Sequence, residues 1–136
     1  MKSGGCLCGA IRYEVRGKIG PIDHCHCSMC RRSHGAPFST FGQIRRAELL
    51  VVAGAELLTT YASSSAVGRS FCAHCGSRLF FRHAALPDHE FVAIGTLDDD
   101  ADLKVEAHIF VGSRAAWDII HDELPQHAGY APIGPE

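Results

Sequence analysis

The chain of 136 residues is long enough for one domain with a hydrophobic core and too short for two, so we expect a single domain over residues 1–136. Its composition is 46% hydrophobic and 21% charged, and its formal net charge of −2 argues against nucleic acid or an anionic membrane as a partner. The first residues contain no apolar run of signal-peptide length, and no stretch could span a bilayer, so we expect a cytoplasmic protein.

Most of the chain is predicted to form β-strands. Ile11, Tyr13 and Val15 alternate with charged residues, which is the period-two pattern of a half-buried strand. Further strands are expected, in chain order, in residues 38–44, 56–63, 77–83, 90–97 and 104–111. Gly, Pro, Asp and Ser occupy the gaps, as turns require. Strand-forming residues lie on both sides of Cys72 and Cys75, which predicts that this pair lies at the tip of a hairpin.

One helix is predicted near the C-terminus, over residues 114–124. Ser113 can cap its first turn and Pro125 ends it. Its apolar residues recur at helical spacing, at Trp117, Ile120 and Leu124. This spacing favours packing of Trp117 on the sheet over a role in binding. The expected fold is therefore mainly β with a short C-terminal helix.

The chain contains seven cysteines, and each lies within three positions of another. An odd number cannot pair completely, and structural disulfides do not persist in a reducing compartment. Clustered thiolates are typical of zinc sites or iron–sulfur clusters, and we expect zinc. The cysteines form an N-terminal pair (Cys6, Cys8), a central trio (Cys25, Cys27, Cys30) and a hairpin pair (Cys72, Cys75).

These groups predict one closed metal site of four cysteines and one open site of three. Residues two apart on a strand point to the same face, so the N-terminal pair can bind one ion together with the hairpin pair. The central trio would then leave one coordination position for a substrate, which is typical of catalytic zinc. The spacing also allows Cys27 and Cys30 to join the hairpin pair, which would leave Cys25 with the N-terminal pair.

Five segments carry a resemblance to a known family. In order, they are GGCLCGAIRYEV, CHCSMCRRSHGAPFSTF, FCAHCGSRLFF, GTLDD and HIFVGSRAAWDIIHDELPQH. Together they resemble the glutathione-dependent formaldehyde-activating enzyme family, to which centromere protein V also belongs, from Gly4 to His127. The resemblance implies an Mss4-like fold of packed, mostly antiparallel sheets stabilised by two zinc ions per chain. It also implies a structural zinc at Cys6, Cys8, Cys72 and Cys75, and a catalytic zinc at Cys25, Cys27 and Cys30.

A zinc ion with three thiolate ligands suits a soft fourth ligand. Three thiolates give the centre a net charge of about −1, so it activates water less well than a three-histidine site does. A substrate thiol would complete the tetrahedron and lose its proton. We therefore expect a carbon–sulfur lyase, similar to S-(hydroxymethyl)glutathione synthase, that joins or splits a thiol such as glutathione and a small aldehyde such as formaldehyde. The alternative is a non-catalytic, zinc-stabilised binding module.

Four residues near the central trio are candidates for handling the substrates. His26 and His34 are candidates to donate a hydrogen bond to the aldehyde oxygen, although His26 could instead hold the loop between two ligands. Arg31 and Arg32 could attract the carboxylates of an anionic thiol, or could form a solvated face. His108 is expected to be a hydrogen-bonded strand residue rather than a ligand.

Overall fold

The computed structural model describes residues 1–131, which form two compact units. The larger unit contains Met1–Gly20 and Gly42–Leu103, and the smaller unit contains Pro21–Phe41 and the chain from Lys104 onward. Each unit is thus built from two separate stretches of sequence. The expectation of a single domain stays a prediction. In residues 1–131 no helix has the length and apolar character that a membrane crossing requires.

Strands dominate the described residues, as the sequence predicts. The only α-helix in residues 1–131 is α1 (Ser28–His34). The strands are β1 (Lys2–Gly5), β2 (Arg12–Val15), β3 (Ile22–Cys25), β4 (Ser39–Arg45), β5 (Leu49–Ala53), β6 (Leu58–Ala62), β7 (Val67–Cys72), β8 (Arg78–His83), β9 (His89–Ala93) and β10 (Ala107–Ile109). The expectation of a mainly β chain is therefore confirmed, whereas the one short helix lies at a different place from the predicted one.

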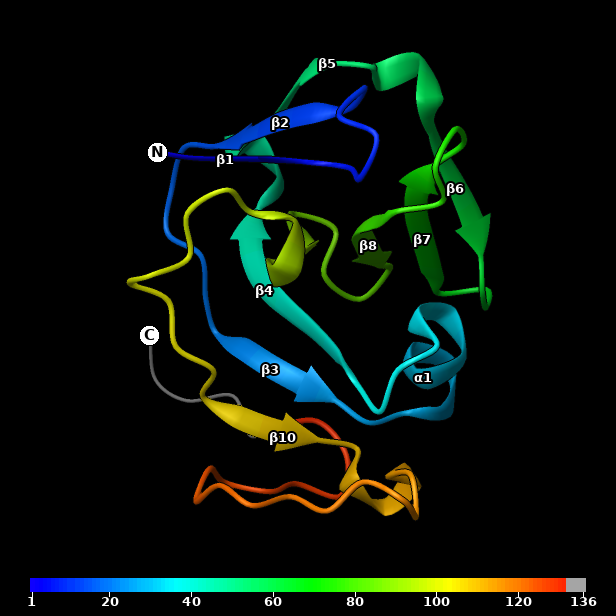
Figure 1. Ribbon diagram of the computed structural model, residues 1–136, viewed down its shortest axis with the longest axis vertical. Helices are drawn as coiled ribbons and strands as arrows, with labels where there is room; N and C mark the ends of the chain where they lie inside the picture. Colours follow the sequence, from blue (N-terminus) through cyan, green and yellow to red (C-terminus); the bar gives the residue numbers. More distant parts are fainter. Residues whose placement is uncertain (132–136) are drawn as a thin grey trace. The chain divides into compact units, whose positions relative to one another are not determined.

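The larger unit contains a three-stranded sheet in the order β1-β2-β5 and a set of strands in the order β4-β9-β8-β7-β6. In Figure 1, β1 and β2 lie side by side, and β2 pairs with both of its neighbours in an antiparallel manner. Ile11, Tyr13 and Val15 are fully buried, as their alternation predicts. The Tyr13 ring meets the Phe80 ring edge-on, with their centroids 5.0 Å apart. This core lies between the N-terminal strands and the β7–β8 hairpin.

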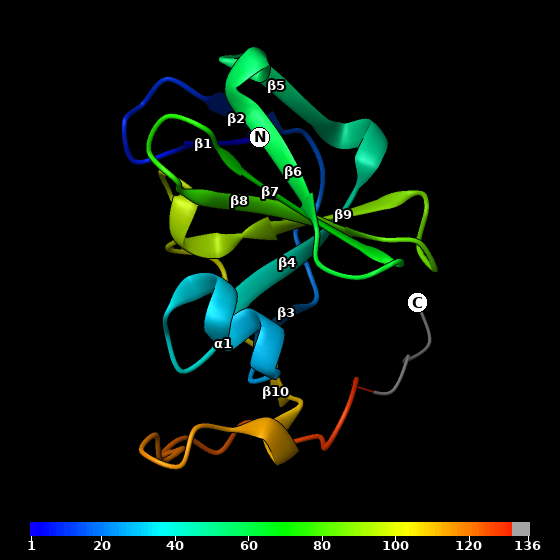
Figure 2. The same cartoon turned by 90° about the vertical axis from the view of Figure 1, so that its right-hand side faces the viewer.

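The smaller unit is built on β3, which pairs in parallel with β10. The local strand order is β10-β3-β4, and β4 is divided between the two units. Figure 2 shows α1 directly after β3 in the chain, so the central trio of cysteines spans the end of this strand and the start of the helix. The parallel pair departs from the mostly antiparallel pairing that is expected for the rest of the chain.

The predicted helix over residues 114–124 does not form. This stretch contains no α-helix, and Trp117 is 70% exposed instead of packing on a sheet. The following residues bond to β10: the His108 N–H donates to the Pro125 carbonyl, and the His127 N–H donates to the His108 carbonyl. The prediction of a C-terminal helix was wrong because these tertiary bonds outweigh a weak helical preference.

Candidate metal centres

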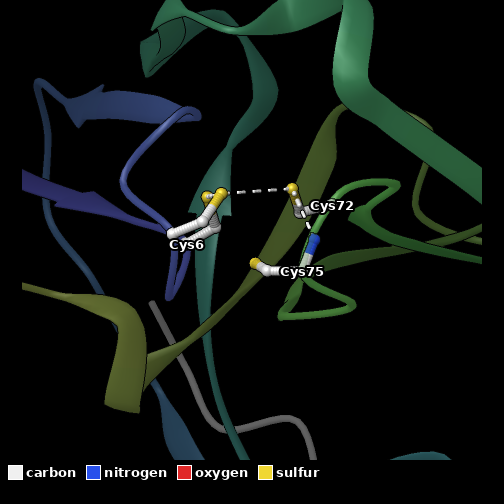
Figure 3. A group of neighbouring side chains, drawn as sticks. Cys6, Cys72 and Cys75 are labelled. Atoms are coloured by element: carbon white, nitrogen blue, oxygen red, sulfur yellow. Dashed lines mark hydrogen bonds between the residues drawn. The ribbon is translucent and has the colours of Figure 1, made fainter.

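The N-terminal pair and the hairpin pair of cysteines meet in one place in the larger unit. Their four Sγ atoms all lie within 4.8 Å of one another. Figure 3 shows the sulfurs of Cys6, Cys72 and Cys75 pointing toward a common space, with Cys6 after β1 and the other two at the β7–β8 turn. Of the two groupings that the sequence allows, the structure thus shows the first, in which the N-terminal pair joins the hairpin pair. We call this group the four-cysteine centre.

The sulfur spacing of the four-cysteine centre fits a tetrahedral zinc site. Zinc–sulfur bonds of about 2.3 Å place the sulfurs of a tetrahedron about 3.8 Å apart. The Sγ atom of Cys8 lies 3.6 Å from that of Cys6 and 4.0 Å from that of Cys72. A disulfide needs a sulfur–sulfur distance of about 2.05 Å, so these are free thiols. The four residues could therefore hold a zinc ion.

Two tight turns present these cysteines, and each contains a glycine with a positive φ. The Gly9 N–H donates to the Cys6 carbonyl at 3.0 Å with a φ of 79°, and the Gly76 N–H donates to the Cys72 carbonyl at 2.8 Å with a φ of 77°. Glycine adopts this left-handed conformation without a steric cost. The prediction that Cys6 and Cys8 lie on a strand was wrong, because β1 ends at Gly5 and a turn brings both sulfurs close to those of the hairpin pair.

Two thiols of the four-cysteine centre, those of Cys75 and Cys8, have pKa values shifted in opposite directions. Backbone N–H groups of Cys8 and Ser77 lower the pKa of the Cys75 thiol to about 6. The Ala10 N–H lowers the pKa of the Cys8 thiol, but desolvation and the neighbouring sulfurs outweigh it and raise this pKa to about 11. Crowded sulfurs resist full ionisation because like charges repel. A bound cation would remove this repulsion, which is how metal sites deprotonate their thiol ligands.

The central trio forms a second cluster, the three-cysteine centre, in the smaller unit. The Sγ atoms of Cys25, Cys27 and Cys30 lie within 4.8 Å of one another. Cys25 ends β3, while Cys27 caps α1, and its Sγ accepts a hydrogen bond from the Cys30 N–H at 3.3 Å. The sulfurs of Cys27 and Cys30 raise the pKa of Cys25. Three sulfurs could hold a zinc ion with one position open to another ligand.

His26 lies between two of these cysteines, but its side chain bonds elsewhere. Its Nε2 atom is 2.8 Å from His108 Nδ1, and His108 Nε2 is 2.9 Å from Asp122 Oδ2. His26 is fully buried, and burial is the main cause that lowers its pKa. The hydrogen bond from His108 lowers the pKa of Asp122. His108 is thus a buried strand residue, as expected, whereas sequence reasoning missed the role of Asp122.

Two further histidines lie near the three-cysteine centre in the sequence. His34 ends α1, and its ring meets the Phe41 ring edge-on with the centroids 5.5 Å apart. His24 was not among the residues predicted from the sequence, and its Nδ1 atom lies 2.7 Å from Thr40 Oγ1. Burial is the main cause that lowers the pKa of His24 to about 4, with His108 and His26 contributing. His24 is therefore neutral at physiological pH.

A cavity of about 270 Å³ borders α1 in the smaller unit. It is lined by Ser28, Arg31, Arg32, Gly35, Ala36 and Trp117. The two candidate arginines thus share a cavity, and Arg31 Nη1 donates to the Ser113 carbonyl at 3.0 Å. The prediction that Trp117 packs in the core was wrong, because this side chain lines the cavity instead. We call it the arginine–tryptophan cavity.

Comparison with known proteins gives a family. A family model described as "Glutathione-dependent formaldehyde-activating enzyme" matches residues 1–113. A Halomonas elongata protein with the name "Putative glutathione-dependent formaldehyde-activating enzyme" is 29% identical over 124 residues, which are 86% of this chain and 79% of the relative. An Aspergillus flavus protein of the same name is 28% identical over 127 residues, and the match spans 92% of this chain but only 58% of that relative.

Two further relatives agree with this result. A Schizosaccharomyces pombe protein named as an uncharacterized lyase is 35% identical over 80 residues, which are 59% of this chain and 56% of the relative. A crystal structure of a Rhodobacter sphaeroides protein is similar with a TM-score of 0.62 and 30% identity, over 76% of this chain and 96% of that chain. The chain therefore belongs to the glutathione-dependent formaldehyde-activating enzyme family.

Proposed function

We propose that this protein is a zinc-dependent carbon–sulfur lyase that joins or splits a thiol and a small aldehyde such as formaldehyde. The observation that carries the proposal is the three-cysteine centre, whose sulfurs gather within 4.8 Å and lack a fourth cysteine. A pure scaffold gains nothing from an open coordination position, whereas an enzyme needs one for its substrate. The names of the relatives, which include a lyase, support this class of reaction.

The two centres have different tasks in this proposal. Cys6, Cys8, Cys72 and Cys75 would hold a structural zinc ion, and Cys25, Cys27 and Cys30 would hold a catalytic one. When bound at the second centre, zinc supplies a positive charge that favours the ionised form of a substrate thiol. The chain contributes three soft sulfur donors, which select a sulfur ligand over a hard oxygen.

The arginine–tryptophan cavity supplies a place for the rest of the thiol substrate. Ser28 and Arg31 line it, and each directly follows a cysteine of the three-cysteine centre in the sequence. Arg31 and Arg32 can attract carboxylates, and the exposed face of Trp117 can pack against an extended peptide-like substrate. Glutathione carries both features, so we propose it as the thiol.

The reaction itself is an addition and its reverse. The sulfur of the thiol bonds to the carbonyl carbon, the carbonyl π-bond becomes a lone pair on oxygen, and the thiol proton ends on that oxygen. Splitting breaks the same carbon–sulfur bond and returns the proton to sulfur. We propose that His26 and His34 form hydrogen bonds with the reacting oxygen, because each lies within four positions of a cysteine of the three-cysteine centre.

The test is whether the zinc-loaded protein speeds the exchange between free glutathione, formaldehyde and their adduct. Magnetisation-transfer NMR at equilibrium measures this exchange directly, above the spontaneous rate. We expect faster exchange with the wild-type protein and the spontaneous rate with Cys27→Ala, which removes one sulfur of the three-cysteine centre. The spontaneous rate with wild-type protein, for glutathione and for other small thiols and aldehydes, would favour a zinc-stabilised binding module instead.

A further inference from the structure

Three side chains of the smaller unit form a continuous hydrogen-bonded series that ends at His26, the residue between Cys25 and Cys27 of the three-cysteine centre. Asp122 Oδ2 lies 2.9 Å from His108 Nε2, and His108 Nδ1 lies 2.8 Å from His26 Nε2. His108 is 2% exposed and His26 is fully buried, while the Asp122 carboxylate is partly exposed. These hydrogen bonds connect Asp122 in the C-terminal segment, through His108 on β10, to His26.

The order of donors and acceptors along this series is fixed by its carboxylate end. An ionised carboxylate can only accept, so His108 must carry its hydrogen on Nε2. In neutral His108 the Nδ1 atom is then an acceptor, and His26 donates to it from Nε2. Neutral His26 is left with an unprotonated Nδ1 atom. That atom is buried and has no hydrogen-bond partner within the described residues.

We propose that Asp122 is a positioning residue for the three-cysteine centre: acting through His108, it holds His26 in the tautomer that presents Nδ1 as a hydrogen-bond acceptor. A buried acceptor without a partner is costly, so such an atom is expected to serve a ligand or an ordered water molecule. In the proposed reaction, on which this part of the inference rests, the donor is the hydroxyl group of the adduct between thiol and aldehyde.

A backbone N–H group also bonds to the Asp122 carboxylate and helps to hold its orientation. The Leu124 N–H donates to Asp122 Oδ1 at 3.0 Å. Oδ1 also lies 3.1 Å from His108 Nε2, but Oδ2 is the nearer oxygen, at 2.9 Å. In Asp122→Asn we expect the single side-chain oxygen to stay with the Leu124 N–H, so that the amide N–H₂ group takes the nearer position and faces His108 Nε2. His108 must then accept at Nε2 and donate from Nδ1, which turns His26 Nε2 into an acceptor. The substitution thus inverts both tautomers and makes His26 Nδ1 a donor.

The experiment is long-range ¹H–¹⁵N NMR on the zinc-loaded protein at neutral pH, which distinguishes protonated from unprotonated imidazole nitrogens. We expect the Nε2–H tautomer for both His26 and His108 in the wild-type protein. We expect the Nδ1–H tautomer for both in Asp122→Asn. Glu123→Gln is the matched control, because it removes the same charge one position further along and should leave both tautomers unchanged.

Binding and exchange measurements distinguish a positioning role of Asp122 from a purely structural one. The cobalt-substituted Asp122→Asn protein should keep the wild-type absorption of its thiolate ligands and its wild-type affinity for glutathione. The exchange rate of the adduct should fall about 10- to 100-fold, the range for lost outer partners of metal sites. An equal loss in Glu123→Gln, or a loss of thiolate absorption in Asp122→Asn, would overturn the positioning role.

Wild-type protein alone can also refute the inference, which matters if Asp122→Asn does not fold. An Nδ1–H tautomer at His26 in wild-type protein would overturn it, as would a variant in which His108 changes tautomer and His26 does not. The proposed function fails separately: wild-type protein that shows the expected tautomers but speeds no exchange would refute the lyase and leave the hydrogen-bonded series established.

Discussion

The sulfur of Cys8 lies 4.0 Å from the sulfur of Cys72, although 64 positions separate the two residues in the chain. A metal ion at this point would connect the turn after β1 to the β7–β8 hairpin. Such a crosslink restricts the unfolded chain over a long loop and adds metal-binding energy to folding. The sulfurs of the three-cysteine centre, by contrast, lie within six consecutive residues. Loss of each centre should therefore affect stability differently.

Cys72→Ala is expected to unfold or aggregate the protein, because structural zinc contributes on the order of 10 kcal/mol to folding. Cys27→Ala, the matched substitution in the other centre, should leave a folded protein without lyase activity. Thermal unfolding followed by circular dichroism compares the two variants with the wild type. Equal destabilisation of both variants would show that the division into a structural and a catalytic site is wrong.

Protein purified without chelator and supplied with zinc should contain two zinc ions per chain. Elemental analysis measures the ratio, and Cys27→Ala should lower it to one, because the four-cysteine centre remains complete. The ion at the three-cysteine centre should also be the first that a chelator removes, since three ligands hold it less firmly than four. A ratio of one or less in folded, zinc-replete wild-type protein would contradict the assignment.

Metal affinity at the four-cysteine centre should fall as the pH falls, because protons compete with the metal for sulfur. Cys75, with a pKa of about 6, is ionised at neutral pH and adds no competition there, whereas Cys8, with a pKa of about 11, must lose a proton on binding. Below about pH 6 Cys75 gains a proton too, so affinity should fall about tenfold more steeply per pH unit. Cobalt competition titrations on Cys27→Ala measure this; an unchanged slope through pH 6 would contradict the prediction.

Glutathione should change the fluorescence of Trp117, which is the only tryptophan in the chain and lines the arginine–tryptophan cavity. Arg31→Ala or Arg32→Ala should weaken this binding more at low salt than at high salt, where screening already reduces the attraction. Arg45→Ala is the control, since this arginine is exposed and does not line the cavity. A fluorescence change of the same size with an uncharged thiol would argue against a role for the two arginines.

Local patterns predicted the strands well where one face is buried. The alternation of Ile11, Tyr13 and Val15 fits β2, and the residues around Cys72 and Cys75 form the predicted hairpin. The short strand β3 and the helix α1 were missed, because a seven-residue helix that begins between metal-ligand candidates carries little periodic signal. Strand β1 and strand β5 were missed as well.

Hydrogen bonds between residues far apart in the chain could not be predicted from the sequence. Trp117, Ile120 and Leu124 have helical spacing, yet the chain here uses Asp122 to bond His108 and uses Pro125 and His127 to bond β10. His26 bonds to His108, which is 82 positions away, and His108 bonds in turn to Asp122, which is 14 positions further along, so no local pattern connects the three residues. The clustering of cysteines in the sequence did predict two cysteine centres that could hold metal ions, because the spacing within each group is itself local.

The most direct test of the lyase account is a titration of the cobalt-substituted protein with glutathione. Addition of the thiol should increase the thiolate-to-cobalt absorption, because its sulfur joins the three sulfurs of Cys25, Cys27 and Cys30. The affinity should rise with pH until the thiol ionises in solution, and Cys27→Ala should show no increase. A wild-type spectrum that stays unchanged with glutathione and with a panel of small thiols would contradict the account.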